Sequence, residues 1–376
     1  MQNKIFSFTL AGKDGKARAG EIVTAHGSIQ TPVFMPVGTR ATVKAITQQQ
    51  LLELDPAIIL GNTYHLYLRP GHELIERVGG GLHGFMAWPR AILTDSGGYQ
   101  IFSLSNLNKI TNEGVKFQSH IDGSFHMITP EKSMEIQRAL GSDIVMAFDQ
   151  CPALPCTREV LEEAVERTLL WARRCCDVKL KPHQALFGII QGGLDLEMRR
   201  RCMRALMEMP FAGFALGGLS VGEKNQEMVD FLNQFVEEMP SERPRYLMGV
   251  GTPLDILKGV TAGLDMFDCV LPTRNARNGQ AITKNGPLSI KREEFKEDVR
   301  PIDPHCACQV CRTHSRAYVR HLFMVNEYTA GTLLTYHNIH FYLQMMRDVR
   351  VSILEKRFDD YCQEFYKSYI VLNPTT

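Results

Sequence analysis

The stretch DIVMAFD, residues 143–149, is a short apolar run that ends on a carboxylate. A run of this length is typical of a strand buried on both faces, because a core helix needs a longer segment. Seven more such runs occur in the first 270 residues, and together they predict eight buried strands: TPVFMPV (31–37), AIILGN (57–62), AILTDS (91–96), ALFGIIQ (185–191), GFALGG (213–218), RYLMGVG (245–251) and LDMFDCV (264–270).

Segments with helical periodicity separate most of these runs, for example 130–141, 159–175 and 252–263. Strands that alternate with helices predict an α/β fold, and eight of them favour a (β/α)8 TIM barrel over a doubly wound open sheet. A barrel gathers the C-terminal ends of its strands at one face, where barrel enzymes carry their chemistry. The polar residues and glycines expected there are Asn62, Asp95, Asp149, Gln191, Gly217, Gly218, Gly251 and Asp268.

An insertion at 101–129 interrupts the alternation. It contains VKFQSHIDGSFHMI, in which two alternating runs flank an Asp-Gly pair. Such a pair between alternating runs is a signal for a tight turn. The insertion therefore predicts a β-hairpin attached to the barrel.

The composition indicates an ordinary globular protein. The chain has 376 residues, of which 44% are hydrophobic and 22% charged, so it can bury a sizeable core. Its apolar runs fall far short of the roughly 20 residues of a membrane helix, and MQNKIFSFTL at the start is too short and too quickly charged for a signal peptide. We expect a cytoplasmic protein with no membrane association. Since the net charge is only +1, binding of a polyanion such as a nucleic acid would depend on a local patch of basic residues.

Three cysteines stand together in the pattern Cys306-x-Cys308-x2-Cys311, whereas the other seven are scattered. A thiolate trio in a reducing compartment indicates a tetrahedral ion with soft ligands, for which zinc is the default. Spacing alone leaves the fourth ligand open among His305, His314, His321, His337 and His340. No carboxylate accompanies the trio, which favours a closed structural site. We predict a barrel domain at 1–300 and a zinc-binding helical subdomain at 301–376.

The arginines near the thiols allow two interpretations. Between Asp303 and Glu327 the chain has no acidic residue but carries Arg312, Arg316 and Arg320. This group fits a patch that faces phosphates, and it equally fits a solvated helix face against a partner subunit.

Carboxylates at the ends of predicted strands suggest glycosyl chemistry. Asp95 precedes a Gly-Gly turn in TDSGGYQ, and Asp149 and Asp268 each end an apolar run. A close pair of carboxylates is how retaining enzymes cleave a glycosidic bond, with one as nucleophile and the other as general acid/base. The plainer alternative for Asp95 or Ser96 is a helix N-cap. Phosphoryl and hydride transfer are disfavoured, because the glycine-rich stretches at 78–84 and 216–222 lack the spacing of a phosphate or dinucleotide loop.

Four motifs together resemble the tRNA-guanine transglycosylase family: TDSGGYQ (94–100), GFALGGLSVGE (213–223), DMFDCVLPTRNARNG (265–279), and the cysteine trio followed by TYHN (335–338). The resemblance spans almost the whole chain. It implies a zinc-bearing (β/α)8 barrel that exchanges guanine at the wobble position of tRNAs with GUN anticodons for a 7-deazaguanine, in queuosine biosynthesis. The reaction would pass through a covalent ribosyl-enzyme intermediate.

The same resemblance assigns roles to residues. Asp268 would be the nucleophile at the ribose C1′, Asp95 the general acid/base, and His337 the fourth ligand of one structural zinc per chain. The base pocket would comprise Asp149, Gln191, Gly218 and Leu219, with Tyr99 and Met248 on the two faces of the ring and with Ser96, Cys151 and Val221 beside it. Arg274 and Arg277 would bind the anticodon loop, although a solvated surface loop is their alternative.

The incoming base and the assembly follow from finer features of the resemblance. Cys151 and Val221 are as in bacterial enzymes that insert the small base preQ1, whereas the stretches GLHGFMAWP, FGIIQGGLD and ILEKRFDD are closer to the eukaryotic subunit that inserts queuine. The family forms homodimers through helices that here include Tyr318 and His321, with His314 in place of an aromatic residue.

Two other functions remain as alternatives. A non-catalytic tRNA-binding subunit would not need Asp95, Asp149 and Asp268. A barrel glycoside hydrolase would leave the thiol trio and PTRNARNG at 272–279 unexplained.

Overall fold

The computed structural model describes residues 5–104 and 108–369. Its centre is a sheet of eight parallel strands in the order β4-β14-β13-β12-β11-β10-β6-β5. A parallel bridge between Val37 and Leu60 joins the first and last members, so the sheet closes. The (β/α)8 barrel is therefore confirmed and the open sheet is excluded. The strands are β4 (Val33–Pro36), β5 (Ile58–Gly61), β6 (Ala91–Thr94), β10 (Ile144–Met146), β11 (Ala185–Ile190), β12 (Gly213–Leu216), β13 (Arg245–Leu247) and β14 (Met266–Cys269).

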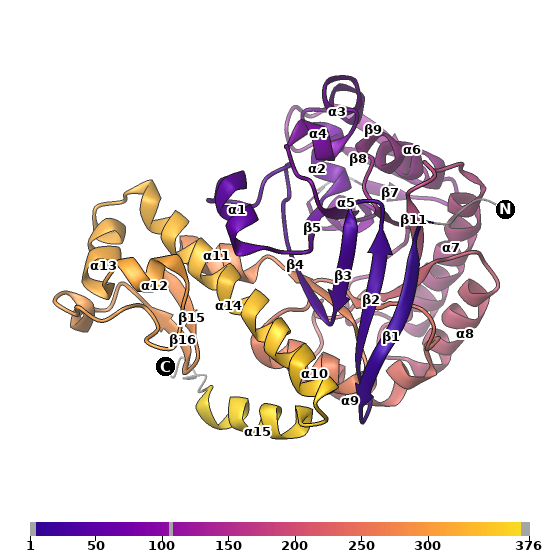
Figure 1. Ribbon diagram of the computed structural model, residues 1–376. Helices are drawn as coiled ribbons and strands as arrows, with labels where there is room; N and C mark the ends of the chain where they lie inside the picture. Colours follow the sequence, from indigo (N-terminus) through magenta and orange to yellow (C-terminus); the bar gives the residue numbers. More distant parts are fainter. Residues whose placement is uncertain (1–4, 105–107, 370–376) are drawn as a thin grey trace.

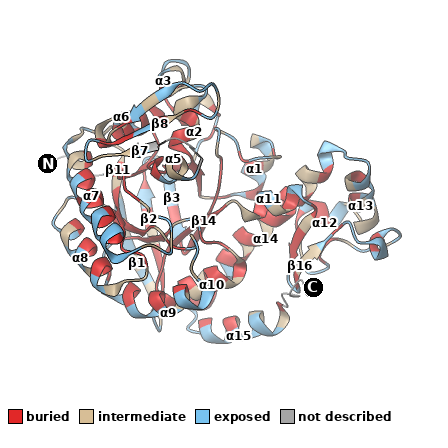
Figure 2. Ribbon diagram, turned by 180° about the vertical axis from the view of Figure 1, so that it is seen from behind, coloured by how far each residue is buried: buried red, intermediate tan, exposed pale blue. Residues whose placement is uncertain are grey.

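Helices surround the barrel and bury one face each, as the red and blue sides of α7 to α9 show in Figure 2. The sequence sets their limits: α6 begins at an N-cap, Thr129, with Pro130 in its first turn, and ends at Gly141 in the left-handed conformation. The helices up to the last barrel strand are α1 (Gln48–Leu54), α2 (Thr63–Leu68), α3 (His72–Gly79), α4 (Leu82–Phe85), α5 (Gly98–Leu104), α6 (Pro130–Leu140), α7 (Arg158–Asp177), α8 (Leu196–Met207), α9 (Asn225–Phe235) with the 3₁₀ turn Val236–Glu238, and α10 (Pro253–Ala262).

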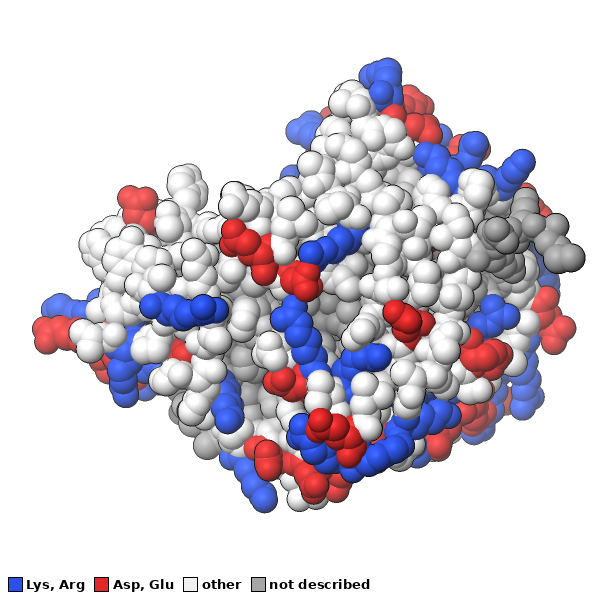
Figure 3. Space-filling view, in the orientation of Figure 1, with Lys and Arg blue, Asp and Glu red and all other residues white. Residues whose placement is uncertain are grey.

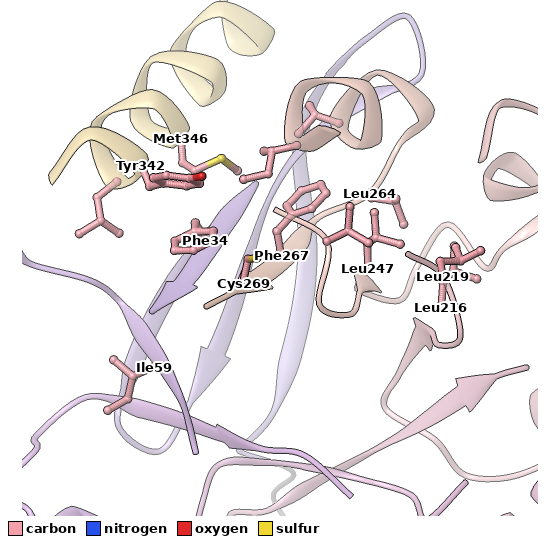
Figure 4. Packing of buried hydrophobic residues seen from close by; sticks show 14 of the residues in the cluster. Phe34, Ile59, Leu216, Leu219, Leu247, Leu264, Phe267, Cys269, Tyr342 and Met346 are labelled. Carbon is pink, nitrogen blue, oxygen red and sulfur yellow. The ribbon is translucent and has the colours of Figure 1, made fainter. Parts of the chain in front are cut away.

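The barrel strands alternate between two buried clusters, as the pleat of a strand requires. Val33 and Met35 of β4 point into the barrel interior, whereas Phe34 belongs to the outer layer beneath the helices. Figure 4 shows this outer layer, where Phe34 lies under Tyr342 with ring centroids 4.7 Å apart. The long helix that carries Tyr342, α14 (Tyr328–Leu354), thereby covers the barrel beside β4.

Two small sheets are added to the barrel. The insertion forms β7 (Asn108–Ile110), β8 (Val115–Gln118) and β9 (Phe125–Ile128), so the predicted hairpin is present and gains a third strand. At the N-terminus an antiparallel sheet comprises β1 (Ser7–Asp14), β2 (Ala17–Thr24) and β3 (Gly27–Thr31), seen in front in Figure 1. The sequence analysis did not predict this sheet. Its Ile22 and Ile29 join the interior cluster of the barrel.

The region after the last barrel strand forms a lobe beside the barrel (Figure 1). It contains α11 (Leu271–Arg277), the hairpin of β15 (Gln280–Thr283) and β16 (Gly286–Ser289), the 3₁₀ turn Glu293–Phe295, α12 (Gln309–Thr313), α13 (Arg316–Met324), α14 (Tyr328–Leu354) and α15 (Phe358–Ser368). The domain boundary at residue 300 stays a prediction. Within the described ranges, no helix has both the length and the apolar character to cross a membrane.

Candidate active site

One cavity of about 420 Å³ opens where the barrel strands end. Its wall includes almost every site residue that the sequence analysis singled out in the barrel: Asp95, Ser96, Tyr99, Asp149, Cys151, Gln191, Gly218, Leu219, Val221, Met248, Asp268 and Arg274. Arg277 lies outside this lining, at the end of α11. The structure thus brings together residues from most of the barrel strands.

Asp268 in β14 is held by two donors on one oxygen. The Tyr246 hydroxyl donates to its Oδ1 at 2.6 Å and the Gly249 N–H donates to the same atom at 2.7 Å. Neither donor is bonded to Oδ2, which keeps that oxygen available at the cavity wall. Burial raises the pKa of this carboxyl, although the two donors counteract the shift.

Asp95 follows β6 and accepts three hydrogen bonds. The Asn62 and Gln100 side-chain amides donate to its Oδ2 at 2.5 and 2.8 Å, and the Thr63 N–H donates to its Oδ1 at 2.8 Å. Burial raises its pKa to about 6, and the negative charge of Asp268 adds to the rise. A carboxyl that titrates near neutral pH can both give and take a proton during turnover.

Asp149 and Gln191 form a polar wall on another side of the cavity. Asp149 Oδ1 accepts from the Ser96 hydroxyl at 2.9 Å and its Oδ2 accepts from Gln191 Nε2 at 2.7 Å. Since a carboxylate only accepts, the Gln191 amide must turn its NH₂ toward Asp149. Its Oε1 is then buried without a hydrogen-bond partner. A buried acceptor in this state requires a ligand donor or water.

Gly218 allows this wall to form. Its φ of +64° is one that side chains rarely adopt, and a Cβ there would lie 2.6 Å from Gln191 Oε1. A larger residue would therefore displace the amide that faces the cavity.

The remaining lining is less polar. Tyr99, 52% exposed, and the half-buried Met248 provide surfaces that suit a flat ring. Burial raises the pKa of the Cys151 thiol to about 12, which favours its protonated form.

Exposed cations lie close to the cavity. Burial lowers the pKa of the Lys44 ammonium, and the charges of Arg277 and Arg40 lower it further. Arg274 contributes in the same direction. The four side chains, which we call the basic rim, are all exposed. On the face shown in Figure 3, by contrast, both charge signs are intermingled without a broad field of one sign.

Two of the three arginines near the thiols, Arg316 and Arg320, are paired with acidic residues, whereas Arg312 is exposed and donates to the Ala307 carbonyl. Arg316 Nη1 lies 3.1 Å from Asp298 Oδ2, and Arg320 pairs with Glu293. Acidic residues that precede the thiol cluster in sequence thus neutralise these two cations.

The thiol cluster gathers with one of the five candidate histidines. The ligand atoms of Cys306, Cys308, Cys311 and His337 all lie within 4.8 Å of one another. His337 Nε2 donates to the Ile282 carbonyl at 2.9 Å, which leaves Nδ1 with its lone pair toward the sulfurs at 3.3 and 3.6 Å. This set could hold a metal ion, and three thiols with one imidazole fit zinc in a tetrahedral site.

Several participants were not predicted from the sequence. Tyr246 belongs to a predicted apolar strand, and Gln100 to the motif TDSGGYQ, but the sequence analysis assigned neither residue a role. Arg40 and Lys44 carry no motif. Asn62 was expected at the strand ends, but its hydrogen bond to Asp95 was not.

A closed barrel whose mouth holds three buried carboxylates around one cavity defines a class of protein, the barrel enzymes that act on glycosidic bonds. The family model described as Queuine tRNA-ribosyltransferase matches residues 14–370. The chain belongs to this family.

Curated relatives agree over nearly their whole length. A Queuine tRNA-ribosyltransferase of Fusobacterium nucleatum is 54% identical over 366 residues, which cover 96% of this chain and 98% of the relative. A protein of the same name from Caldanaerobacter subterraneus is 53% identical, over 94% of this chain and 94% of its own length. Another from a Thermoanaerobacter species is 52% identical, over 96% of this chain and 97% of its own length.

Proposed function

We propose that this protein is a tRNA-guanine transglycosylase, a pentosyltransferase that replaces guanine at the anticodon wobble position with a 7-deazaguanine in queuosine biosynthesis. The observation that carries the proposal is the shared cavity of Asp95, Asp149 and Asp268 with the unpartnered Gln191 Oε1. Base exchange tests it directly. We expect the protein to release labelled guanine from tRNA when a deazaguanine base is supplied, and tRNA that keeps its label would contradict the proposal.

The chemistry divides between the two carboxylates. Asp268 attacks C1′ of the nucleoside, so that a C–O bond forms as the C1′–N9 bond breaks and the ribose stays bound to the enzyme. Asp95 provides a proton to the departing guanine. It then takes the N9 proton of the incoming base, whose nitrogen attacks C1′ and releases Asp268.

The pocket holds the base by its edge and its faces. Asp149 accepts hydrogen bonds from the N–H groups of the Watson–Crick edge, while Gln191 and the backbone of Gly218 and Leu219 complete the polar outline. Tyr99 and Met248 stack on the ring, and stacking is worth about 1–3 kcal/mol per base.

The tRNA reaches this pocket along the basic rim, Arg40, Lys44, Arg274 and Arg277. We expect Arg40→Ala and Lys44→Ala each to weaken tRNA binding at low salt, since each removes a phosphate contact. The slope of log Kd against log salt should fall by about one per charge, measured by filter binding. Lys367→Ala, an exposed lysine on α15, is the control. If the salt dependence of Kd is unchanged in both Arg40→Ala and Lys44→Ala, the tRNA phosphates do not contact these residues and the proposed path along the basic rim is wrong.

The incoming base is proposed to be preQ1 rather than queuine, because Val221 lines the cavity and its side chain would crowd the bulkier base. Overfilling a packed site costs about 1–3 kcal/mol, or roughly a ten- to hundredfold loss of affinity for the bulkier queuine. We expect preQ1 to win in steady-state competition. Val221→Gly should improve queuine use within that range, and Val221→Ala should fall between. If the glycine variant gains nothing for queuine, Val221 does not select the base.

Zinc in the Cys306, Cys308, Cys311 and His337 site is proposed as a structural ion, one per chain. The protein is also proposed to act as a homodimer in the cytoplasm. Exposed apolar side chains on and beside α13 support an interface there, with Tyr318 at 44% and Tyr328 at 96% exposure. All ten cysteines lie within the described residues, and no two of them form a disulfide.

A further inference from the structure

A second cluster of ligand-type side chains lies at the opposite end of the barrel from the cavity. His26 is in the turn between β2 and β3, His83 is in α4, and Asp143 immediately precedes β10. Asp143 Oδ1 is 2.7 Å from His26 Nδ1, and Asp143 Oδ2 is 3.2 Å from His83 Nε2. The two imidazoles stack with centroids 3.6 Å apart and planes at 15°.

The carboxylate of this cluster is fully buried and accepts hydrogen bonds on both oxygens. Its side chain has no exposed surface, and the Ile92 N–H donates to Oδ2 at 2.9 Å. Burial acts against ionisation, but the hydrogen bonds from His83 and His26 outweigh it and hold the pKa of the Asp143 carboxyl below its usual value. The proposed exchange reaction uses none of these three residues.

We propose that His26, His83 and Asp143 form a second metal site, which takes a divalent transition ion such as Zn²⁺ or Co²⁺. Two imidazole nitrogens and one carboxylate oxygen are a common ligand set for such ions. The three ligand atoms lie within 4.8 Å of one another. Tetrahedral ligand atoms around an ion with bonds of about 2.0–2.1 Å are roughly 3.3 Å apart. The two nitrogens face different oxygens of Asp143, so both imidazoles must adjust within the cluster to share the ion with one of these oxygens.

Solvent can reach the ion and complete its coordination. The His26 and His83 side chains are 31% and 16% exposed, so the cluster opens on the histidine side. Three protein ligands with an open position describe an exchangeable site, in contrast to the closed cluster of three thiols and His337.

The ion competes with protons for the same atoms. Without it, His26 Nδ1–H donates to Asp143 Oδ1, and His83 Nε2–H donates to the Arg90 carbonyl at 3.0 Å while lying 3.2 Å from Asp143 Oδ2. Binding must displace these protons, so it weakens as the pH falls. Since the ligands come from the N-terminal sheet, α4 and the barrel, the bound ion stabilises the folded chain by mass action.

Variants can keep the hydrogen bonds and remove the ligands. His26→Asn places an amide N–H where Nδ1 stands, and His83→Gln places one where Nε2 stands. His183→Gln is the matched control, because its ring lies edge-on to His26 at 5.9 Å and its Nε2 faces the Gly141 carbonyl at 3.2 Å rather than Asp143.

The experiment is a titration of tag-free protein, already saturated at the thiol site, with Zn²⁺ by calorimetry and with Co²⁺ by absorption. We expect a second equivalent in the unmodified protein and in His183→Gln, and a rise in Tm with added Zn²⁺. Both ligand variants should bind this equivalent more than about a hundredfold more weakly and lose the Tm response. No second equivalent in the unmodified protein, or undiminished binding in His26→Asn and His83→Gln, would overturn the proposal.

Discussion

Asp268→Asn is expected to lower the rate of base exchange by more than about 10⁴-fold and to abolish the covalent adduct with tRNA. An amide is too poor a nucleophile to displace guanine from C1′. Without the ribosyl ester, the incoming base has no activated carbon to attack. The loss should therefore appear in the chemical step and not in the affinity for tRNA.

The structure indicates that this variant keeps its fold. Tyr246 and Gly249 both donate to Oδ1 of Asp268, and the Oδ1 of an asparagine can accept the same two hydrogen bonds. The amide NH₂ would then take the place of Oδ2, the oxygen that neither donor occupies. Because burial raises the pKa of Asp268, replacing the carboxylate by a neutral group also removes a charge that burial disfavours.

Denaturing gels with labelled tRNA measure the adduct, and filter binding measures affinity. We expect Asp268→Asn to bind tRNA as the unmodified protein does, through the basic rim. Asp95→Asn is the informative companion, since it should also fail in exchange while leaving the nucleophile intact. An undiminished adduct in Asp268→Asn would require a different nucleophile.

The barrel could be predicted because its strands carry a strong local signal. Each is a short run buried on both sides, and all eight runs became barrel strands. The N-terminal sheet gave no such signal: β1 alternates between exposed and half-buried residues, and β2, although mostly buried, buries small or charged residues such as Ala17, Arg18 and Ala19 instead of a continuous apolar run. Weak alternation of this kind is hard to distinguish from a loop.

The candidate site, like the fold, has features that the sequence predicts and features that it does not. Carboxylates at strand ends follow from the topology, so Asp95, Asp149 and Asp268 could be placed at one face beforehand. The orientation of the Gln191 amide could not be predicted, because it follows from the hydrogen bond that Gln191 Nε2 donates to Asp149, a contact between two separate strand ends.

The basic rim shows why some residues could not be found from the sequence. Lys44 and Arg274 are far apart in the chain, and neither Arg40 nor Lys44 belongs to a recognisable motif. Closure of the barrel pairs β14 with β4, which brings the segment after β4 beside α11. Only the three-dimensional register reveals that contact.

Removal of zinc from the proposed site of three thiols and His337 is expected to have a large effect, like that of Asp268→Asn. The effect should appear in the stability of the fold instead of in the chemical step. Structural zinc in small domains contributes about 10–16 kcal/mol of apparent binding free energy, which exceeds the whole stability of many proteins. Here Cys308 and His337 are buried, and Asn338 beside His337 holds β15 through its contact with the Ile282 N–H at 2.8 Å. Loss of the ion should therefore loosen β15, α12 and the adjoining part of α14 together.

Cys308→Ser tests this expectation, because serine has nearly the same size but is a poor zinc ligand. We expect elemental analysis to give about one zinc for the unmodified protein and much less for the variant, with a large fall in Tm and loss of the proposed dimer. Cys362→Ser is the control, since this buried thiol of α15 lies outside the cluster. A chelator-treated protein that stays folded and dimeric would contradict a structural role. The barrel could retain its strands in the variant, but α14 lies against both β4 and β15, so disorder at the cluster should spread along this helix to the barrel wall.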